Sequence, residues 1–407
     1  MARSSQPQPV STLGRLMAFS ALVSTTNLRL MNKADIERQI LEGPTLKVAI
    51  SVDTCIYQQH GFRLESGQLR HLEQFSGTPG VVVMSDVVQH EVLTHMVTEA
   101  VKAKSKLKGA LEDVRNHWPT AAGAPTSSDI LGTETAEIVT TGRLDAFLCR
   151  CGGEVINSSG RVDIADLMKR YFQPSLPFER SGDKKHEFPD AVALIALESW
   201  AEEHNKPILL VSNDRGWQEF AEASTHLSCV AELDEALELF QKRDATRTQL
   251  VDHVTALLEA EAESWDGLHE LASLLNSTMW VEDASAMFDY DLDLQVDVTE
   301  VKFVNDPALG SLRAIDYSNG SLTIIGKFEA TVFVEATFGF VMDGVYLGGC
   351  VVSENKTVNF EALITFEEPG GDELKAVDIE LVRKMHKLDF GHIEPDYSDE
   401  DPTFEKY

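Results

Sequence analysis

Two apolar runs in this chain each lead into an aspartate, and they restrict the fold more than any other feature. Residues 46–52, Leu-Lys-Val-Ala-Ile-Ser-Val, precede Asp53, and residues 208–212, Ile-Leu-Leu-Val-Ser, lie just ahead of Asp214. A third run, Val-Val-Val-Met-Ser, spans residues 81–85. Apolar strands that alternate with helical stretches predict an α/β fold with a parallel sheet covered by helices. Because the carboxyl ends of parallel strands meet at one edge, we expect the two aspartates to lie close together.

Two further acids are expected on helices. Asp86 begins a helical pattern in which Glu91 lies about one turn from the start. Pro189 suits the first turn of another helix because its φ is fixed, and Asp190 then lies in that turn. Four carboxylates in one cleft would repel strongly without cations, so the pattern predicts a site for Mg²⁺ or Mn²⁺. Such an ion lowers the pKa of a bound water, which makes hydrolysis of a phosphodiester the expected chemistry.

Most of these acids also have a purely structural interpretation. Asp214 could cap the helix that follows it, and Asp190 could complement a helix dipole. Asp86 lies on the same predicted helix as Glu91 and could take its place. Asp53 is harder to explain in this way, because burying an unpaired carboxylate is costly.

The residues around these acids resemble the PIN-domain nucleases. The resemblance rests on Ser-Val-Asp53-Thr, on Glu91 in the following helix, and on two longer motifs. These are Lys-Lys-His-Glu-Phe-Pro-Asp190-Ala and Val-Ser-Asn-Asp214-Arg-Gly-Trp, which are close to a bacterial, largely uncharacterised subgroup of the family. The resemblance covers residues 46–240, about half of the chain, and implies a PIN-like parallel sheet flanked by helices.

The resemblance implies a role for each matching position. Asp53, Glu91, Asp190 and Asp214 would be the metal-binding and catalytic acids. Ser212 matches a small hydroxyl residue that would orient water or a carboxylate. Most members of the family cut single-stranded RNA internally. A metal-dependent endoribonuclease is therefore expected, with a toxin-like or defence role in a bacterium.

Residues near the third acid are candidates for supporting roles. Glu187 could be an auxiliary ligand or a solvated loop charge. Lys184 and Lys185 precede Asp190 and could grip a substrate phosphate, or they could belong to a solvated loop. The alternating lysines of residues 102–108 form the best basic patch in the chain, although their spread over more than one helix face is typical of a solvated surface.

The net charge of −31 is distributed unevenly along the chain. It is +2 over residues 1–45, −11 over residues 46–240 and −22 over residues 241–407. A surface as acidic as the last part repels phosphate backbones, so that part is a poor nucleic-acid binder. We expect RNA contacts to come from local basic patches and bound metal in the first domain.

A change of pattern after residue 240 divides the chain. We expect an N-terminal extension over residues 1–45, a PIN-like nuclease domain over 46–240, an acidic helical segment over 244–284, a β-rich domain over 285–394 and a disordered acidic tail over 395–407. Period-two alternation from residue 292, with turn signals at 318–320 and 343–344, predicts an antiparallel sheet. The β-rich domain is the expected contact for a protein partner or for a second copy of the chain.

Three observations bear on the location of the protein. No apolar run approaches the ~20 residues of a membrane span. The five cysteines lack the spacing of a disulfide framework. The apolar stretch after Arg15 resembles a short signal-peptide core, but no convincing cleavage site follows it. A cytoplasmic protein with reduced thiols and no membrane contact is expected.

Other functions are compatible with a strand that ends in aspartate. A DNA or flap nuclease of related fold would carry a basic helical arch. Only the lysine-rich residues 102–108 could form such an arch. A phosphatase of the haloacid-dehalogenase type needs a second carboxylate two residues after Asp53, where Cys55 stands. An inactive PIN-like binding or regulatory module is the non-enzymatic alternative, and the presence of all four acids argues against it.

Overall fold

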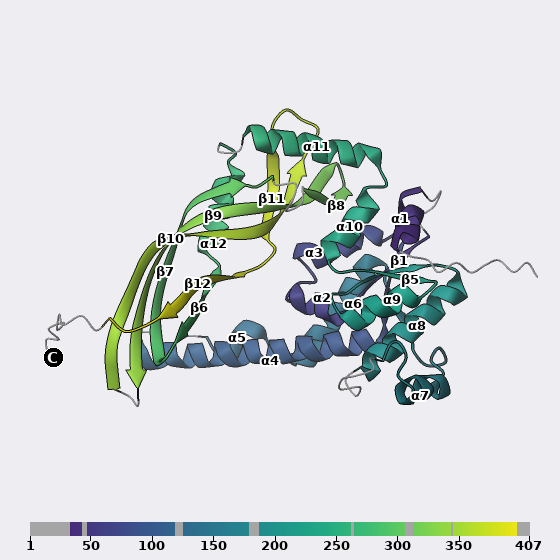
Figure 1. The fold of residues 1–407 in the computed structure, drawn as a ribbon, viewed down its shortest axis with the longest axis horizontal. Helices are drawn as coiled ribbons and strands as arrows, with labels where there is room; N and C mark the ends of the chain where they lie inside the picture. The colour runs from purple at the N-terminus through teal and green to yellow at the C-terminus, as the bar shows by residue number, and fades with distance from the viewer. Residues whose placement is uncertain are drawn as a thin grey trace, which may run out of the picture.

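The chain forms an α/β unit and a β-rich unit, which lie at opposite sides of the view in Figure 1. The computed structural model describes residues 33–42, 47–118, 125–178, 187–261, 264–305, 312–342 and 345–396. The candidate residues Lys184 and Lys185, the first 32 residues of the expected extension and the tail from residue 397 lie outside the described residues.

A five-stranded sheet forms the centre of the α/β unit. Its order is β3-β2-β1-β4-β5, and every neighbouring pair is parallel. The strands are β1 (Ala49–Val52), β2 (Val81–Ser85), β3 (Glu154–Ile156), β4 (Ile208–Val211) and β5 (Leu227–Val230). Every residue of β1 and β4 is buried, which explains their unbroken apolar sequence. The predicted parallel sheet is confirmed.

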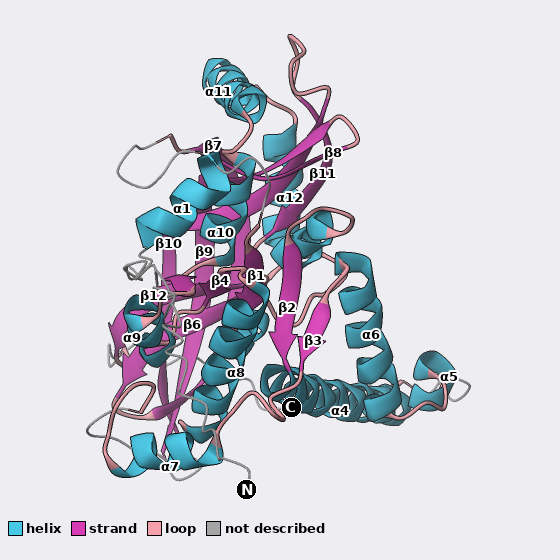
Figure 2. Cartoon of the chain, turned by 90° about the vertical axis from the view of Figure 1, so that its right-hand side faces the viewer, coloured by secondary structure: helices cyan, strands magenta, loops and turns pink. Residues whose placement is uncertain are grey.

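Figure 2 shows the helices of this unit, several of which flank the sheet. They are α1 (Lys33–Glu42), α2 (Thr54–Gln59), α3 (Gly67–Arg70), the 3-10 helix η1 (His71–Phe75), α4 (Asp86–His117), α5 (Ser127–Leu131), α6 (Ala136–Cys151), α7 (Ile164–Phe172), α8 (Phe188–His204), α9 (Arg215–Ala223) and α10 (Leu233–Gln241). Helix α5 packs on α4 instead. Ser85 caps α4, because its Oγ accepts a hydrogen bond from the Val88 N–H at 3.1 Å. Helix α4 therefore starts at Asp86 and passes through the lysine-rich stretch, as predicted.

Two elements differ from the sequence-based expectations. The sequence pattern of residues 129–172 predicts mostly helical structure, yet β3 interrupts it. Two of the three residues of β3 are exposed at the edge of the sheet, so the sequence contains no apolar run that would predict this strand. The expected N-terminal extension contains helix α1, whose Ile40 is fully buried.

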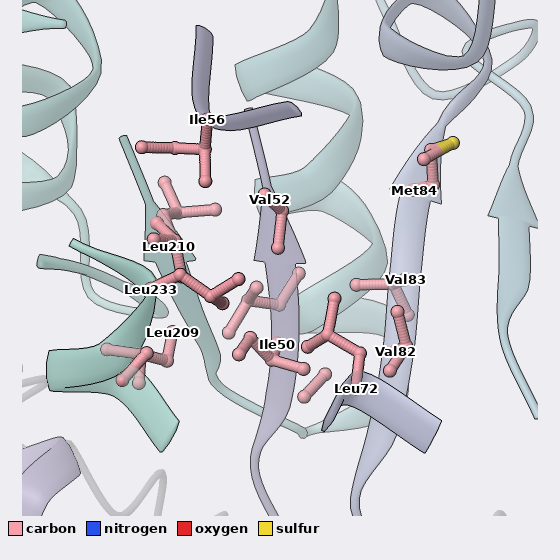
Figure 3. Close-up of a cluster of buried hydrophobic side chains, with 14 of the residues drawn as sticks. Ile50, Val52, Ile56, Leu72, Val82, Val83, Met84, Leu209, Leu210 and Leu233 are labelled. Atoms are coloured by element: carbon pink, nitrogen blue, oxygen red, sulfur yellow. The ribbon is translucent and has the colours of Figure 1, made fainter. Parts of the chain in front are cut away.

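The core of the α/β unit joins the sheet to the segments packed on it (Figure 3). Ile50 of β1, Val82 of β2 and Leu209 of β4 contribute from the strands. Leu72 of η1 and Leu233 of α10 contribute from the covering helices. This packing fixes the central strands, and with them the positions of the residues at their carboxyl ends.

A long, antiparallel sheet forms the β-rich unit, in the order β11-β10-β9-β7 with β8 paired to β9. The strands are β6 (Met279–Ala286), β7 (Asp289–Phe303), β8 (Arg313–Ser318), β9 (Ser321–Met342), β10 (Val345–Glu367), β11 (Lys375–Leu381) and β12 (Met385–Ile393). Alternate residues of β9 from Phe328 to Phe338 are fully buried, which matches the predicted period-two pattern. Asn319 and Gly320 join β8 to β9 with φ of 53° and 81°, the positive values that a tight hairpin turn requires.

The second sheet of this unit was not predicted. Strands β6 and β12 pair in parallel, although only antiparallel pairing was expected here. They lie at the two ends of the strand-rich region, so no local pattern indicates their pairing. Helices α11 (Ala245–Ala260) and α12 (Gly267–Asn276) precede them, and β6 begins at Met279, inside the stretch expected to be helical.

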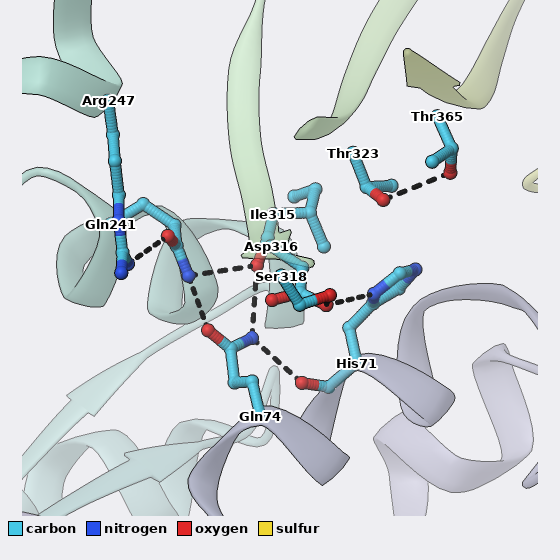
Figure 4. Close-up of polar contacts among 9 residues, drawn as sticks. All are labelled: His71, Gln74, Gln241, Arg247, Ile315, Asp316, Ser318, Thr323 and Thr365. Atoms are coloured by element: carbon cyan, nitrogen blue, oxygen red, sulfur yellow. Dashed lines mark hydrogen bonds and ion pairs between the residues drawn. The ribbon is translucent and has the colours of Figure 1, made fainter. Parts of the chain in front are cut away.

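The two units share a core and a polar interface. Ile315, Ile325, Leu363 and Val382 of the β-rich unit belong to the same buried cluster as the sheet of the α/β unit. Beside this cluster, the Gln74 side-chain amide donates a hydrogen bond to the Ile315 carbonyl at 3.0 Å (Figure 4). The boundary between the units is therefore continuous packing, not an exposed linker.

No helix among these residues is both long and apolar enough to cross a lipid bilayer. The longest helix, α4, has 32 residues. After Met96 none of its side chains is buried, and its lysines at 102, 104, 106 and 108 are all exposed.

The ion pair between Arg313 and Asp234 provides a test of the interface. The two side chains come from different units and approach to 2.7 Å, with 25% and 8% of them exposed. We expect Arg313→Ala to lower the free energy of unfolding by about 3 kcal/mol, because it leaves Asp234 buried and uncompensated. Urea unfolding measures this loss.

The control is Lys102→Ala, which removes the Lys102–Glu99 pair, whose side chains are 61% and 58% exposed. A much smaller loss is expected there, because solvent screens an exposed pair. Similar losses in both variants would contradict the role assigned to the buried pair.

Candidate metal-binding and catalytic site

Asp53 is held in a buried position at the carboxyl end of β1. Only 5% of the residue is exposed. Its Oδ2 accepts hydrogen bonds from the Ser212 hydroxyl at 2.7 Å and from the Cys55 thiol at 2.9 Å. Burial raises the pKa of Asp53 above its ordinary value, although the two hydrogen bonds act in the opposite direction. This carboxylate is positioned by its neighbours and is costly to ionise without a cation.

Asp214 follows β4 and lies at the start of α9. Its Oδ1 accepts a hydrogen bond from the Trp217 N–H at 3.1 Å, so the capping role considered from the sequence is present. The Asp214 N–H donates to the Ser212 hydroxyl at 3.0 Å, which ties this loop to the residue that holds Asp53. The residue is exposed, and the cap engages only one of its two carboxylate oxygens.

Asp190 lies in the first turn of α8 and is half-buried. Its Oδ1 accepts a hydrogen bond from the Trp217 indole N–H at 2.9 Å. The pKa of Asp190 is raised to about 6, first by burial and then by the negative charges of Asp53, Glu91 and Asp214. The charges of the other three predicted acids therefore all act on Asp190.

Glu91 faces the same region from α4. The Thr54 hydroxyl donates to its Oε2 at 2.8 Å, and Thr54 directly follows Asp53 in the sequence. The alternative residue, Asp86, is engaged elsewhere, because its Oδ2 accepts hydrogen bonds from the N–H and the hydroxyl of Ser158, both at 3.0 Å. The geometry favours Glu91 as the fourth acid.

The two supporting candidates in the described residues occupy different positions. Ser212 is fully buried and connects Asp53 with the backbone of Asp214 through its hydroxyl. Glu187 is half-buried at the residue that precedes α8, and its side chain makes no capping hydrogen bond there. Ser212 is thus in direct contact with Asp53 and with the backbone of Asp214, whereas Glu187 precedes the helix that carries Asp190.

The donor chemistry fits a hard divalent cation. All four side chains carry carboxylate oxygens, which Mg²⁺ and Mn²⁺ prefer as ligands, and a bound cation would offset their mutual repulsion. Within the described ranges, no three His, Cys, Asp or Glu side chains form a group that could hold a metal ion. Mg²⁺ retains several waters and is commonly held by one or two carboxylates, so a closed group of three is not required.

Three residues that hold the acids were not predicted as site residues. Thr54 donates to Glu91, Cys55 donates to Asp53, and the Trp217 indole donates to Asp190. These contacts could not be predicted, because each one joins elements that are separate in sequence or depends on the direction in which a side chain points. The only sequence signal was proximity, because Thr54 and Cys55 follow the first acid and Trp217 closes the last motif.

Comparisons with known proteins identify the first unit. Residues 50–217 match the family model described as PIN domain, which confirms the resemblance for this part of the chain. A solved structure is also similar, the crystal structure of VapBC2 from Rickettsia felis bound to a DNA fragment from their promoter. That similarity has 13% sequence identity, covers 45% of this chain and 98% of that chain, and has a TM-score of 0.24. No curated protein matches the chain.

The raised pKa of Asp190 predicts a pH-dependent effect on stability. Between the ordinary value of 3.8 and about 6, the folded protein retains a proton that the unfolded chain has released. Ionisation of Asp190 therefore lowers stability as the pH rises through this window. We expect Asp190→Asn to raise the free energy of unfolding by about 2 kcal/mol at about pH 8. The asparagine keeps an oxygen that accepts from Trp217.

Urea unfolding in the presence of a chelator, at several pH values, measures this gain. The gain should shrink as the pH falls below about 6 and vanish below about 4, where both chains hold the proton. A destabilised variant, or a gain that does not depend on pH, would contradict the electrostatic interpretation of the site.

Proposed function

We propose that this chain, whose residues 50–217 carry a PIN domain, is a metal-dependent endoribonuclease that hydrolyses phosphodiester bonds of single-stranded RNA. PIN domains are in general nucleases. Metal dependence and the choice of RNA are the parts of the proposal that go beyond the family match.

The convergence of four carboxylates on one region is the observation that carries the proposal. The pKa of Asp190 is raised first by burial and then by the charges of three acids, which lie at the end of β1, on α4 and at the start of α9. This arrangement destabilises the protein unless a cation offsets the repulsion. Proteins retain such a cost at sites that bind or react.

The residues of the chain would hold the ion and align the substrate. Asp53 and Asp214, at the two strand ends, would bind the ion, with Glu91 and Asp190 completing its surroundings directly or through water. A bound Mg²⁺ or Mn²⁺ lowers the pKa of water and stabilises negative charge on phosphate oxygens. Ser212 orients Asp53 through its hydroxyl, and a proton held on Asp190 would be released when the ion binds.

The charge distribution supports a substrate held largely through metal and local cations. The α/β part is acidic overall, and the exposed lysines at positions 102, 104, 106 and 108 of α4 are its densest basic run. An interaction of this kind acts on the phosphate backbone and does not read bases. A substrate without a strict sequence requirement fits this charge distribution. The choice of single-stranded RNA, in a toxin-like or defence role, rests on the resemblance to the PIN-domain nucleases.

Two other functions make different predictions in the same assay. A DNA or flap nuclease would use the lysines of α4 as a basic arch and would cut branched DNA faster than RNA. An inactive PIN-like module would bind nucleic acid without cutting it. Single-stranded RNA, single-stranded DNA and a DNA flap, each tested with Mg²⁺ and with Mn²⁺, separate these functions from the proposed one.

We expect Asp53→Asn and Asp214→Asn to lower the rate of RNA cleavage by about 100-fold or more, because each removes a charge that would bind metal. Both substitutions keep the side-chain shape and an acceptor oxygen. A gel-based cleavage assay with either metal measures the rate, and circular dichroism checks that the variants remain folded. Variants that cut as fast as the parent protein would refute the site assignment.

A matched pair of substitutions on α4 tests the fourth acid. Glu91→Gln should lower the rate by about tenfold or more, whereas Asp86→Asn should leave it within about twofold of the parent. Asp86 is turned toward Ser158, and asparagine preserves an acceptor for that contact. The opposite ranking would show that Asp86 is the catalytic residue and Glu91 is structural.

A further inference from the structure

A cavity of about 570 Å³ opens in the β-rich unit where two strands diverge. Strand β11 pairs with β10 only over Ala362–Glu367 of the latter. The Val382 N–H donates to the Glu361 carbonyl at 3.0 Å, and the chain then leaves β10 to start β12, which pairs with β6. The cavity lies along this divergence, and its volume is typical of small-molecule sites.

The cavity wall is basic within an acidic part of the chain. Lys327, Arg383 and Lys387 line it, together with a single carboxylate, that of Glu361. Residues 241–407 as a whole carry a net charge of −22. A local excess of cations in such surroundings attracts a small anion, whereas a long nucleic-acid strand would also meet the acidic surface.

Part of the wall is aromatic and apolar. Phe360 is 5% exposed, and its ring stacks on Phe328 with centroids 5.6 Å apart. Val358 and Met385 extend the apolar lining. Such a wall offers a planar group of a ligand a surface on which to pack.

A buried histidine in the wall lacks a hydrogen-bond partner for one of its nitrogens. His386 is 6% exposed, and its Nε2 has no partner among the residues that the structure describes. The ring hydrogen-bonds to the backbone of Arg383, and burial lowers its pKa, so the imidazole is neutral near pH 7. With Nδ1–H donating to that backbone carbonyl, Nε2 is an acceptor, and leaving it unmatched in a buried position is costly.

We propose that this cavity binds a nucleoside monophosphate. The phosphate would lie against Lys327, Arg383 and Lys387, which outnumber the one carboxylate that lines the cavity. Lys387 also approaches Asp283 at 3.8 Å, but both side chains are exposed, so the pair would yield to a phosphate. The base would pack on Phe360 and present an N–H donor to Nε2 of His386. This site lies outside the PIN domain, and the proposal does not depend on the nuclease activity.

Calorimetric titration of the full-length protein with AMP, GMP, CMP and UMP tests the site. The buffer contains a chelator, so that binding does not involve divalent metal at the acids. We expect at least one of the four to bind saturably at one ligand per chain, at least about tenfold more tightly than inorganic phosphate or its parent nucleoside. The affinity should fall as the salt concentration rises.

Substitutions locate the binding. Arg383→Ala and Lys387→Ala each remove an exposed cation from the cavity and should weaken binding by about tenfold. Lys384→Ala removes an exposed cation that does not line the cavity, and should change the affinity by less than about twofold. Asp53→Asn should bind as the parent does, because the nuclease site is not involved.

Several results would overturn the proposal. One is the absence of saturable binding by all four nucleotides, and another is an equal effect of Lys384→Ala and Lys387→Ala. Tighter binding of inorganic phosphate than of any nucleotide would show that the apolar wall is not used. Complete displacement of the nucleotide by an equimolar single-stranded RNA would assign the cavity to a nucleic-acid strand.

Discussion

The placement of four carboxylates near one edge of the sheet, where burial and the charges of the other three raise the pKa of Asp190, is the constraint on which the proposed site depends. Two of them follow the central strands of a parallel sheet, so the topology brings them to one edge. The other two approach from α4 and α8. The neighbouring residues resist the repulsion through single hydrogen bonds, from Ser212 and Cys55 to Asp53, and from Trp217 to Asp190. Each donor fixes a charge that would otherwise turn toward solvent.

A short helix connects this region to the boundary with the β-rich unit. Helix α2 begins beside the acids, where Thr54 contacts Glu91, and its six residues end at Gln59. The Gln59 side chain donates to Glu232 at 2.7 Å and accepts from Asn213, next to Asp214, at 3.2 Å. The two ends of α2, with these contacts, are therefore only about 9 Å apart.

The end of α2 also borders a second cavity, of about 180 Å³, between the two units. His60 and Gln68 line it from the α/β unit and are each 4% exposed. Glu361 and Arg383 line it from the other side, and both also line the larger cavity of the β-rich unit. Two residues of the β-rich unit thus contact the space next to α2 and the proposed nucleotide site at the same time.

The features that the sequence predicted well are those with a local cause. Buried parallel strands are continuous apolar runs, so the sequence predicts β1, β2 and β4. The positions of Asp53 and Asp214 follow from the ends of β1 and β4. Strand β3 was missed because three residues at a sheet edge leave no such run, and the β6–β12 pair was missed because its members are far apart in sequence. The choice between Glu91 and Asp86 also required tertiary contacts, since both lie on one helix. The hydrogen-bond donors to the acids could not be assigned for the same reason.

The shared core has a consequence for the order in which the protein is completed. Ile315, Ile325, Leu363 and Val382 belong to the cluster that supports the parallel sheet, yet they are synthesised long after Asp214. Arg63 adds to this dependence, because its guanidinium donates to the Leu381 and Val382 carbonyls. A nascent chain whose four acids have just left the ribosome does not yet contain the residues that make these packing and hydrogen-bond contacts. The sheet edge that gathers the acids gains its full packing only after almost the whole polypeptide has been synthesised, which delays the finished site in the cell that makes it.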